Sequence, residues 1–231
     1  MRGHDPCRAD EEGTNCPQPT SPEPSIITEP TPAPTTPEPA DLFADKDNLE
    51  VAPGVQVRDD GGYCFNGGEA GVAVKSFPRL ASAEDNSFVV TIDVTLREGP
   101  TPFGYLFSKG AGGSSRYYSA FLRRDGRIHF YYRTVGSEEQ QQTVITSEAG
   151  KLVLRNTAYR IRLRVVGDLV VTTVTSSSVT ESLDTVLLGP VDDCDSPSDT
   201  CTLHVGQRTP GEKTLRSACI TGVSMDTDTD L

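Results

Sequence analysis

The sequence of 231 residues contains no tryptophan, only three histidines and no long hydrophobic run. A helix that crosses a membrane needs roughly 20 consecutive apolar residues, so we expect no membrane insertion in this segment. Histidine is the usual acid or base of enzymes, but His4 lies near the polar start, and His129 and His204 each lie within a strand-like pattern. These shortages argue against an enzyme.

Basic side chains are also fewer than acidic ones. The chain carries 33 acidic and 21 basic side chains, which gives a formal net charge of −12. An acidic chain repels phosphate backbones, so we expect no nucleic-acid partner. The excess is uneven, because residues 1–50 carry −8 and the other 181 residues carry only −4.

The six cysteines form an even, scattered set with no C-x-x-C pair and no histidine at zinc-ligand spacing. They are Cys7, Cys16, Cys64, Cys194, Cys201 and Cys219. Such a set is typical of disulfides formed outside the cytosol. The start of the chain has no apolar segment of the signal-peptide type. We therefore expect an extracellular segment of a longer precursor, or a chain with a misassigned start.

Proline divides the chain. Nine of the 17 prolines lie in residues 17–40, where threonines stand beside them. This composition is typical of a semi-stiff spacer, and also of O-glycosylated stalks. We predict a short cysteine-containing stub over residues 1–16, a disordered Pro/Thr-rich linker over 17–51 and one folded domain over 52–228.

Within the expected domain, apolar and polar residues alternate with a period of two. Residues 88–97 and 159–165 alternate cleanly, as one half-buried strand each would. Asp125-Gly126 joins two further runs and favours the tight turn of a β-hairpin. Helical periodicity is missing. The pattern predicts an all-β domain of many short antiparallel strands, arranged as a sandwich or a barrel.

Several stretches resemble laminin-G-like domains. Residues 202–206, which end in glycine, precede Pro210 and then Cys219-Ile220, an order similar to the closing signature of that family. Residues 63–68 resemble its opening strand. Family members usually carry Trp-His where this chain has Tyr159-Arg160, so the chain resembles a divergent member.

The resemblance implies a concanavalin A-like jelly roll of two curved antiparallel sheets, used in adhesion and ligand recognition. Thrombospondin N-terminal domains, pentraxins and legume lectins are similar in architecture. In this fold the first and last strands are neighbours, which allows Cys64 to pair with Cys219 and Cys194 with Cys201. The family habit implies instead that Cys194 or Cys201 pairs with Cys219. Spacing alone leaves both arrangements open.

Two groups of arginines are candidate ligand-binding residues. Three alternate with apolar residues in one predicted strand and must share its outer face. Three more flank the predicted hairpin turn. The six are Arg160, Arg162, Arg164, Arg123, Arg124 and Arg127. Guanidinium groups bind sulfate or carboxylate in a two-pronged manner, as a sulfated glycan requires. The alternative is a solvated face whose arginines pair with neighbouring acids.

A cluster of acids suggests a second kind of site. Its members are Asp192, Asp193, Asp195 and Asp199. Calcium prefers several carboxylate and carbonyl oxygens, and some laminin-G domains bind one ion at the rim, so calcium is an alternative here. Solvated loop acids are the simpler interpretation. We expect no other cofactor.

Together these observations predict a non-enzymatic extracellular recognition or adhesion module within a larger multidomain protein. Its partner would be a matrix or cell-surface protein or a sulfated glycan. One alternative is a calcium-dependent, lectin-like carbohydrate-binding domain. Another is a glycoside hydrolase of the same fold, which needs two facing carboxylates. Neither Glu181 with Asp184 nor Asp192 with Asp193 supplies such a pair on one face of a well-patterned strand.

Overall fold

The computed structural model of the protein describes residues 41–68, 71–75, 87–99, 101–110, 116–193, 202–208 and 214–227. The predicted stub and the predicted linker up to residue 40 lie outside these ranges, as do Cys7 and Cys16. Within them the only helical element is one 3-10 turn, η1 (Lys46–Asn48). No helix of this part of the chain is long and apolar enough to cross a membrane.

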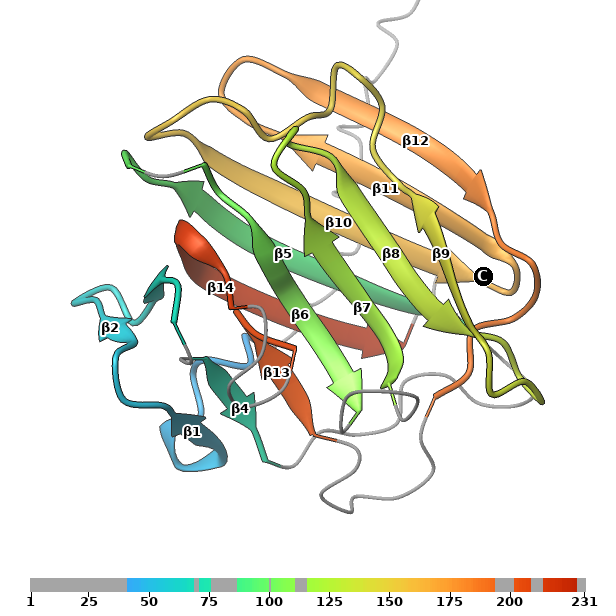
Figure 1. Ribbon diagram of the computed structural model, residues 1–231, viewed down its shortest axis with the longest axis horizontal. Coiled ribbons are helices and arrows are strands. Elements are labelled where there is room, and N and C mark those ends of the chain that lie inside the picture. Colours follow the sequence, from blue (N-terminus) through green and yellow to red (C-terminus); the bar gives the residue numbers. More distant parts are fainter. Residues whose placement is uncertain are drawn as a thin grey trace, which may run out of the picture. The chain divides into compact units, whose positions relative to one another are not determined.

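The described strands form two antiparallel sheets of seven strands each. In order across the first sheet they are β1 (Leu49–Val51), β4 (Val72–Val74), β13 (Leu203–Val205), β6 (Gly104–Gly110), β7 (Arg116–Leu122), β8 (Ile128–Arg133) and β9 (Gln140–Val144). Across the second they are β12 (Thr180–Val186), β11 (Leu169–Thr175), β10 (Ala158–Val166), β5 (Phe88–Leu96), β14 (Arg216–Thr227), β3 (Tyr63–Asn66) and β2 (Gln56–Val57). In Figure 1, β6 to β9 cross in front of the second sheet.

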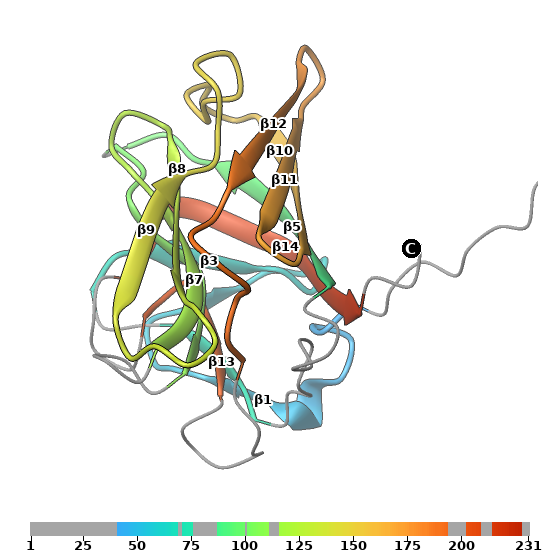
Figure 2. The ribbon, with the colours of Figure 1, turned by 90° about the vertical axis from the view of Figure 1, so that its right-hand side faces the viewer.

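The two sheets pack face to face as a sandwich, which Figure 2 shows from the side. The core lies between them and is built from the apolar halves of the alternating strands. In β5 and β10, buried and more exposed residues alternate, as the sequence predicts. Phe88 of β5 and Tyr118 of β7 meet across the core with ring centroids 5.0 Å apart. The prediction of an all-β antiparallel sandwich is confirmed.

The sandwich begins earlier than the predicted boundary at residue 52. The backbone N–H of Leu42 donates to the carbonyl of Val223 at 2.8 Å. Phe43 is buried and packs edge-on against Tyr63, with centroids 4.8 Å apart. Residues 41–51 therefore belong to the folded domain, and their assignment to a disordered linker was wrong. Strand β1 has only three residues, which is too short for alternation to be visible.

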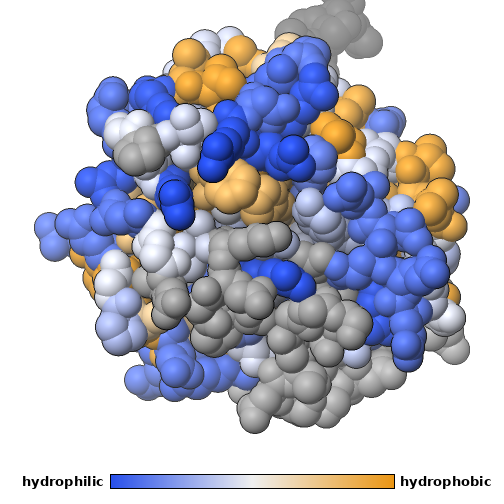
Figure 3. Space-filling model, in the orientation of Figure 1, coloured by the Kyte–Doolittle hydropathy of each residue, from blue (hydrophilic) through white to orange (hydrophobic). Residues whose placement is uncertain are grey.

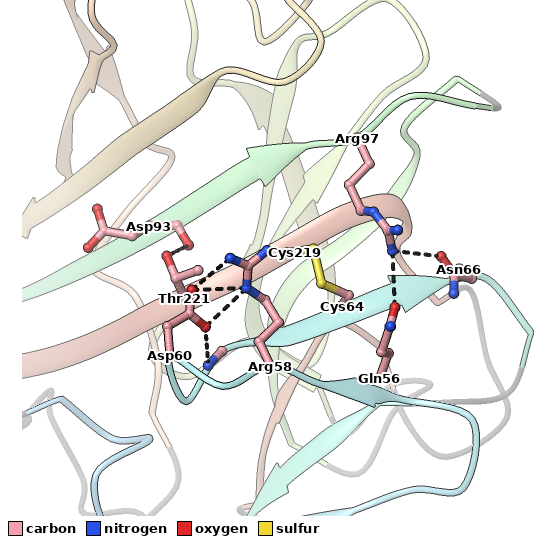
Figure 4. Close-up of a disulfide and its surroundings, with 10 residues drawn as sticks. Gln56, Arg58, Asp60, Cys64, Asn66, Asp93, Arg97, Cys219 and Thr221 are labelled. Carbon is pink, nitrogen blue, oxygen red and sulfur yellow. Dashed lines mark hydrogen bonds and ion pairs between the residues drawn. A yellow bond between two sulfur atoms is a disulfide. The ribbon is translucent and has the colours of Figure 1, made fainter.

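A disulfide joins the early strand β3 to the last strand, β14 (Figure 4). Cys64 and Cys219 are directly paired in the sheet and are both buried. This pairing excludes the one that the family habit implies for Cys219. Cys194 and Cys201 lie outside the described residues. Beside the disulfide, Arg97 reaches the side-chain oxygens of Gln56 and Asn66, each at 3.4 Å.

Candidate functional site

A pocket of about 510 Å³ lies on the outer face of the first sheet, where β6 begins and β7 ends. Its walls combine aromatic rings with charged side chains of the β7–β8 turn. The lining residues are Phe103, Tyr105, Phe121, Arg123, Arg124, Asp125 and Tyr131. Figure 3 shows this side of the molecule with a hydrophobic patch bordered by hydrophilic residues.

Strand alternation directs the aromatic side chains outward. Phe121 and Tyr131 each stand between two residues of the core, so they project from the opposite face of the sheet. A β-bulge in β6 lies just after Tyr105 and leaves it directly opposite Phe121. The bulge matters because it allows an aromatic ring to face outward from β6 while the residues that follow return to the core.

The rings hold one another in place. Phe121 packs edge-on against Phe103 and Tyr105, with centroid separations of 4.9 and 4.7 Å. Tyr131 lies 6.3 Å from Phe121 and closes the cluster. Edge-to-face aromatic pairs contribute roughly 0.5–1.5 kcal/mol each beyond their buried area. The pocket therefore has an apolar floor that is ordered before any ligand binds.

The rim of the pocket is the tight turn that the sequence predicts. Gly126 has φ of +85° and the backbone N–H of Arg123 donates to the carbonyl of Arg127 at 2.8 Å. A β-carbon at Gly126 would lie 2.9 Å from the carbonyl oxygen of Leu152, so only glycine fits this close approach. The turn is thereby held against the segment that follows β9.

The three arginines of this turn have different surroundings. Arg127 forms ion pairs with Glu148 and Asp125. Arg124 lies over the ring of Phe103, 5.3 Å from its centroid, in a cation–π contact. Arg123 and Arg124 are exposed, and neither forms an ion pair with a carboxylate in the described part of the chain. Two guanidinium groups are thus available at the pocket.

Two histidines project from the same outer face. His129 of β8 lies beside Tyr131, and its pKa is below the ordinary value because of burial and the positive charge of Arg123. His204 of β13 is nearly fully buried, which lowers its pKa as well. Its Nδ1 atom has no hydrogen-bond partner among the described residues.

The folded domain is expected to lose stability when these histidines become protonated. Both pKa values are lower in the folded chain, so the unfolded chain binds protons at a higher pH. The free energy of unfolding should fall as the pH drops through about 6.5 and level off below the folded-state pKa values. Urea unfolding at about pH 7.5 and about pH 5.5 measures this. A double variant, His129→Gln with His204→Gln, should show a flatter dependence, and an equally steep one would contradict the prediction.

The comparisons with known proteins agree on the fold alone. No protein-family model matches the sequence, and no curated protein is significantly similar to it. Among solved structures, the binding domain of botulinum neurotoxin serotype D matches with a TM-score of 0.51 and 7% identity, over 78% of this chain and 43% of that one. The type G receptor-binding domain matches with a TM-score of 0.50 and 9% identity, over 77% and 42%. The neurotoxin DC binding domain, solved with rat synaptotagmin II, matches with a TM-score of 0.50 and 10% identity, again over 77% and 42%.

The fold that this chain shares with these domains is a jelly-roll β-sandwich of two antiparallel sheets. The chain spans less than half the length of the solved structures that it matches. Membership of the laminin-G family stays a prediction, since no comparison shows that family.

The structure separates the two predicted arginine groups. Arg160, Arg162 and Arg164 do project together from β10, but β10 belongs to the second sheet. They lie on the outer face of the sandwich opposite to the pocket. Arg160 is also held by Asp93 of β5 in a two-pronged pair, with N–O distances of 2.8 and 2.9 Å. The six arginines therefore cannot act as one surface.

The two described members of the predicted calcium cluster each bind a cation of the protein. Asp192 pairs with Arg133 at 3.0 Å. Asp193 pairs with Lys109 at 2.6 Å, and both of these side chains are fully buried. Asp195 and Asp199 lie outside the described residues. In the ranges described, no three acidic, histidine or cysteine side chains are grouped to hold a metal ion, and calcium binding stays a prediction.

Sequence reasoning missed the aromatic half of the pocket. Phe103, Tyr105, Phe121 and Tyr131 look like core residues, because apolar side chains on both faces of a strand usually mean burial on both faces. The sequence does contain a sign of this surface, because aromatic residues occur at both odd and even positions of β7 and β8. Such doubly aromatic strands in an antiparallel sheet indicate that the outer face also carries an apolar surface.

Proposed function

We propose that this chain is a non-enzymatic extracellular recognition domain whose pocket binds an acidic sugar of a matrix or cell-surface glycan. The observation that carries the proposal is the ordered aromatic floor with Arg123 and Arg124 at its rim. Ligand sites in proteins are typically concave and apolar, with a few placed polar groups that set specificity. This pocket has both parts.

The chemistry of the pocket matches an acidic sugar. One face of a pyranose ring presents mainly C–H groups, which pack on aromatic rings, while its hydroxyl groups need hydrogen-bond partners. Tyrosine offers an apolar ring and a polar tip in one side chain, and Tyr105 and Tyr131 line the pocket. The planar guanidinium group binds carboxylate or sulfate with two parallel hydrogen bonds. Arg123 and Arg124 can supply such forks.

Two further observations support an extracellular and non-catalytic role. Disulfides such as Cys64–Cys219 persist in oxidising compartments. Most glycoside hydrolases use two carboxylates that flank the scissile bond, whereas Asp125 is the only carboxylate among the described residues that line the pocket. Glu181 and Asp184 lie three positions apart on β12 and so project from opposite faces of that strand.

The test is titration calorimetry of the protein with a heparin-derived hexasaccharide, a hyaluronan hexasaccharide, sialyllactose and neutral lactose. The double variant Arg123→Ser with Arg124→Ser should bind the acidic ligands at least about tenfold more weakly, since a hydrogen bond to a charged group contributes roughly 1.5–3 kcal/mol. The matched control is Arg162→Ser with Arg164→Ser, which removes the same charge from the opposite outer face. The control should bind as the unchanged protein does.

Other outcomes would overturn the proposal. A loss confined to the Arg162 and Arg164 variant would move the site to the outer face of β10. Equal losses in both variants would indicate attraction by net charge without a built site. Binding abolished by a chelator and restored by calcium would favour the calcium-dependent lectin instead.

A further inference from the structure

A second hollow adjoins the aromatic pocket at the end of the sandwich where β6 and β14 begin. This hollow has a volume of about 180 Å³ and is lined by Thr101, Phe103, Arg124 and Arg216. Phe103 and Arg124 line both spaces, so the stacked pair of ring and guanidinium forms their shared wall. The two hollows are therefore adjoining sections of one path.

Backbone contacts between the two sheets place Arg216 at the far end of this path. Its N–H donates to the carbonyl of Phe103 at 3.0 Å, in an isolated bridge that joins the start of β14 to the segment before β6. Leu215, the preceding residue, is fully buried and anchors the strand. Arg216 thus occupies a fixed position relative to the wall that both hollows share.

The side chain of Arg216 lies across a glycine. A β-carbon at Gly67 would come within 2.9 Å of its Cγ and Nε atoms, and Gly67 has φ of +85°. Glycine at this position both accepts the backbone conformation and leaves the arginine stem in place. Arg216 is exposed and forms no ion pair with the carboxylates of the described ranges. Its guanidinium group is available to a ligand.

Three guanidinium groups consequently follow one path, from Arg123 and Arg124 at the pocket to Arg216 at the adjoining hollow. A single acidic sugar would occupy the pocket and leave Arg216 without a function. A chain of sugars with an acidic group on successive units would supply an anion at both ends of the path. Such a ligand gains affinity because its second contact forms within an already bound molecule.

We propose that the ligand is an acidic oligosaccharide and that Arg216 forms a second subsite, which holds the acidic group of the next sugar. This inference rests on the proposed function, because it extends the same pocket. In this arrangement Arg216 selects for longer ligands, whereas Arg123 and Arg124 select for ligands that carry an acidic group.

The experiment compares a ligand with one acidic group with a ligand that has several. Glucuronic acid and a heparin-derived tetrasaccharide are titrated into the protein, and affinities are measured from NMR chemical-shift changes. Arg216→Ser should bind the tetrasaccharide about tenfold more weakly, as loss of one charge-assisted contact implies. It should bind glucuronic acid with unchanged affinity. Arg162→Ser, which removes an exposed arginine from the opposite face, should change neither.

The outcomes separate the inference from the function on which it rests. If Arg216→Ser leaves the tetrasaccharide affinity unchanged while Arg123→Ser with Arg124→Ser lowers it, the second subsite is wrong and the pocket stands. If the pocket variant also leaves both affinities unchanged, the proposed function fails. If Arg216→Ser weakens both ligands equally, Arg216 acts on the first pocket and the assignment by length is overturned. An unchanged thermal midpoint confirms that each variant is folded.

Discussion

Replacing Lys109 with methionine is expected to lower the free energy of unfolding by about 3–5 kcal/mol. Lys109 projects from β6 into the sandwich, and its Nζ atom lies 2.6 Å from Oδ1 of Asp193, with both side chains fully removed from solvent. The ammonium group also lies over the ring of Tyr118, 5.6 Å from the centroid. Without it, the carboxylate of Asp193 would lose the ammonium group that pairs with it at a fully buried position. Urea unfolding followed by circular dichroism measures the change.

The control for this prediction removes both charges. Lys109→Met with Asp193→Leu should recover most of the lost stability, because replacing a buried ion pair by apolar side chains is often neutral or stabilising. A double variant as unstable as Lys109→Met would show that the loss comes from packing around Lys109. An unchanged Lys109→Met would show that the ion pair contributes nothing. The pair also affects Tyr118, whose pKa is raised by burial and by the negative charge of Asp193.

Removing the disulfide is expected to cost about 5 kcal/mol in the free energy of unfolding. Cys64 and Cys219 are 155 residues apart in the sequence, so the bond restricts a very long loop in the unfolded chain. Alanine at both positions avoids placing hydroxyl groups in their buried environment. Urea unfolding of the double alanine variant, compared with the unchanged protein before and after reduction, gives the difference.

A second comparison identifies the source of this stability. The reduced protein and the double alanine variant should unfold at similar urea concentrations, because both lack the covalent restriction. If the alanine variant is as stable as the oxidised protein, the bond adds nothing to stability. If it is much less stable than the reduced protein, the loss comes from packing around the two sulfur atoms.

Alternation in the sequence predicted the strands well where one face of a sheet is apolar and the other is polar. β5 and β10 are such strands, and the turn at Asp125-Gly126 has the short-range chemistry that a hairpin needs. Local pattern says nothing about which sheet a strand joins. For that reason the sequence did not show how the arginines of β10 lie relative to those of the hairpin, which project from the opposite side of the sandwich.

Other features depend on contacts between residues far apart in the sequence. The alternating pattern around Lys109 does not indicate that its charge is buried. Its partner Asp193 lies 84 positions later in the sequence. Asp193 belonged to an apparent calcium cluster because its neighbours are also acidic. The second hollow likewise needs Phe103 and Arg216 to meet at the end of the sandwich where β6 and β14 begin. The sequence alone predicts which segments form strands, but these contacts between distant residues exist only once the two sheets have packed together.

The link between β3 and β14 also determines how the domain would respond to a mechanical pull on its two ends. Tension entering before Cys64 passes through the sulfur–sulfur bond to Cys219 and leaves along the end of β14. The 155-residue interval between them carries no load, so about 500 Å of chain is withheld from extension. A pull can detach the segments outside the loop, such as β2 and the edge contacts of residues 41–51. The pocket and the hollow at Arg216 lie within the protected loop and would keep their shape under load.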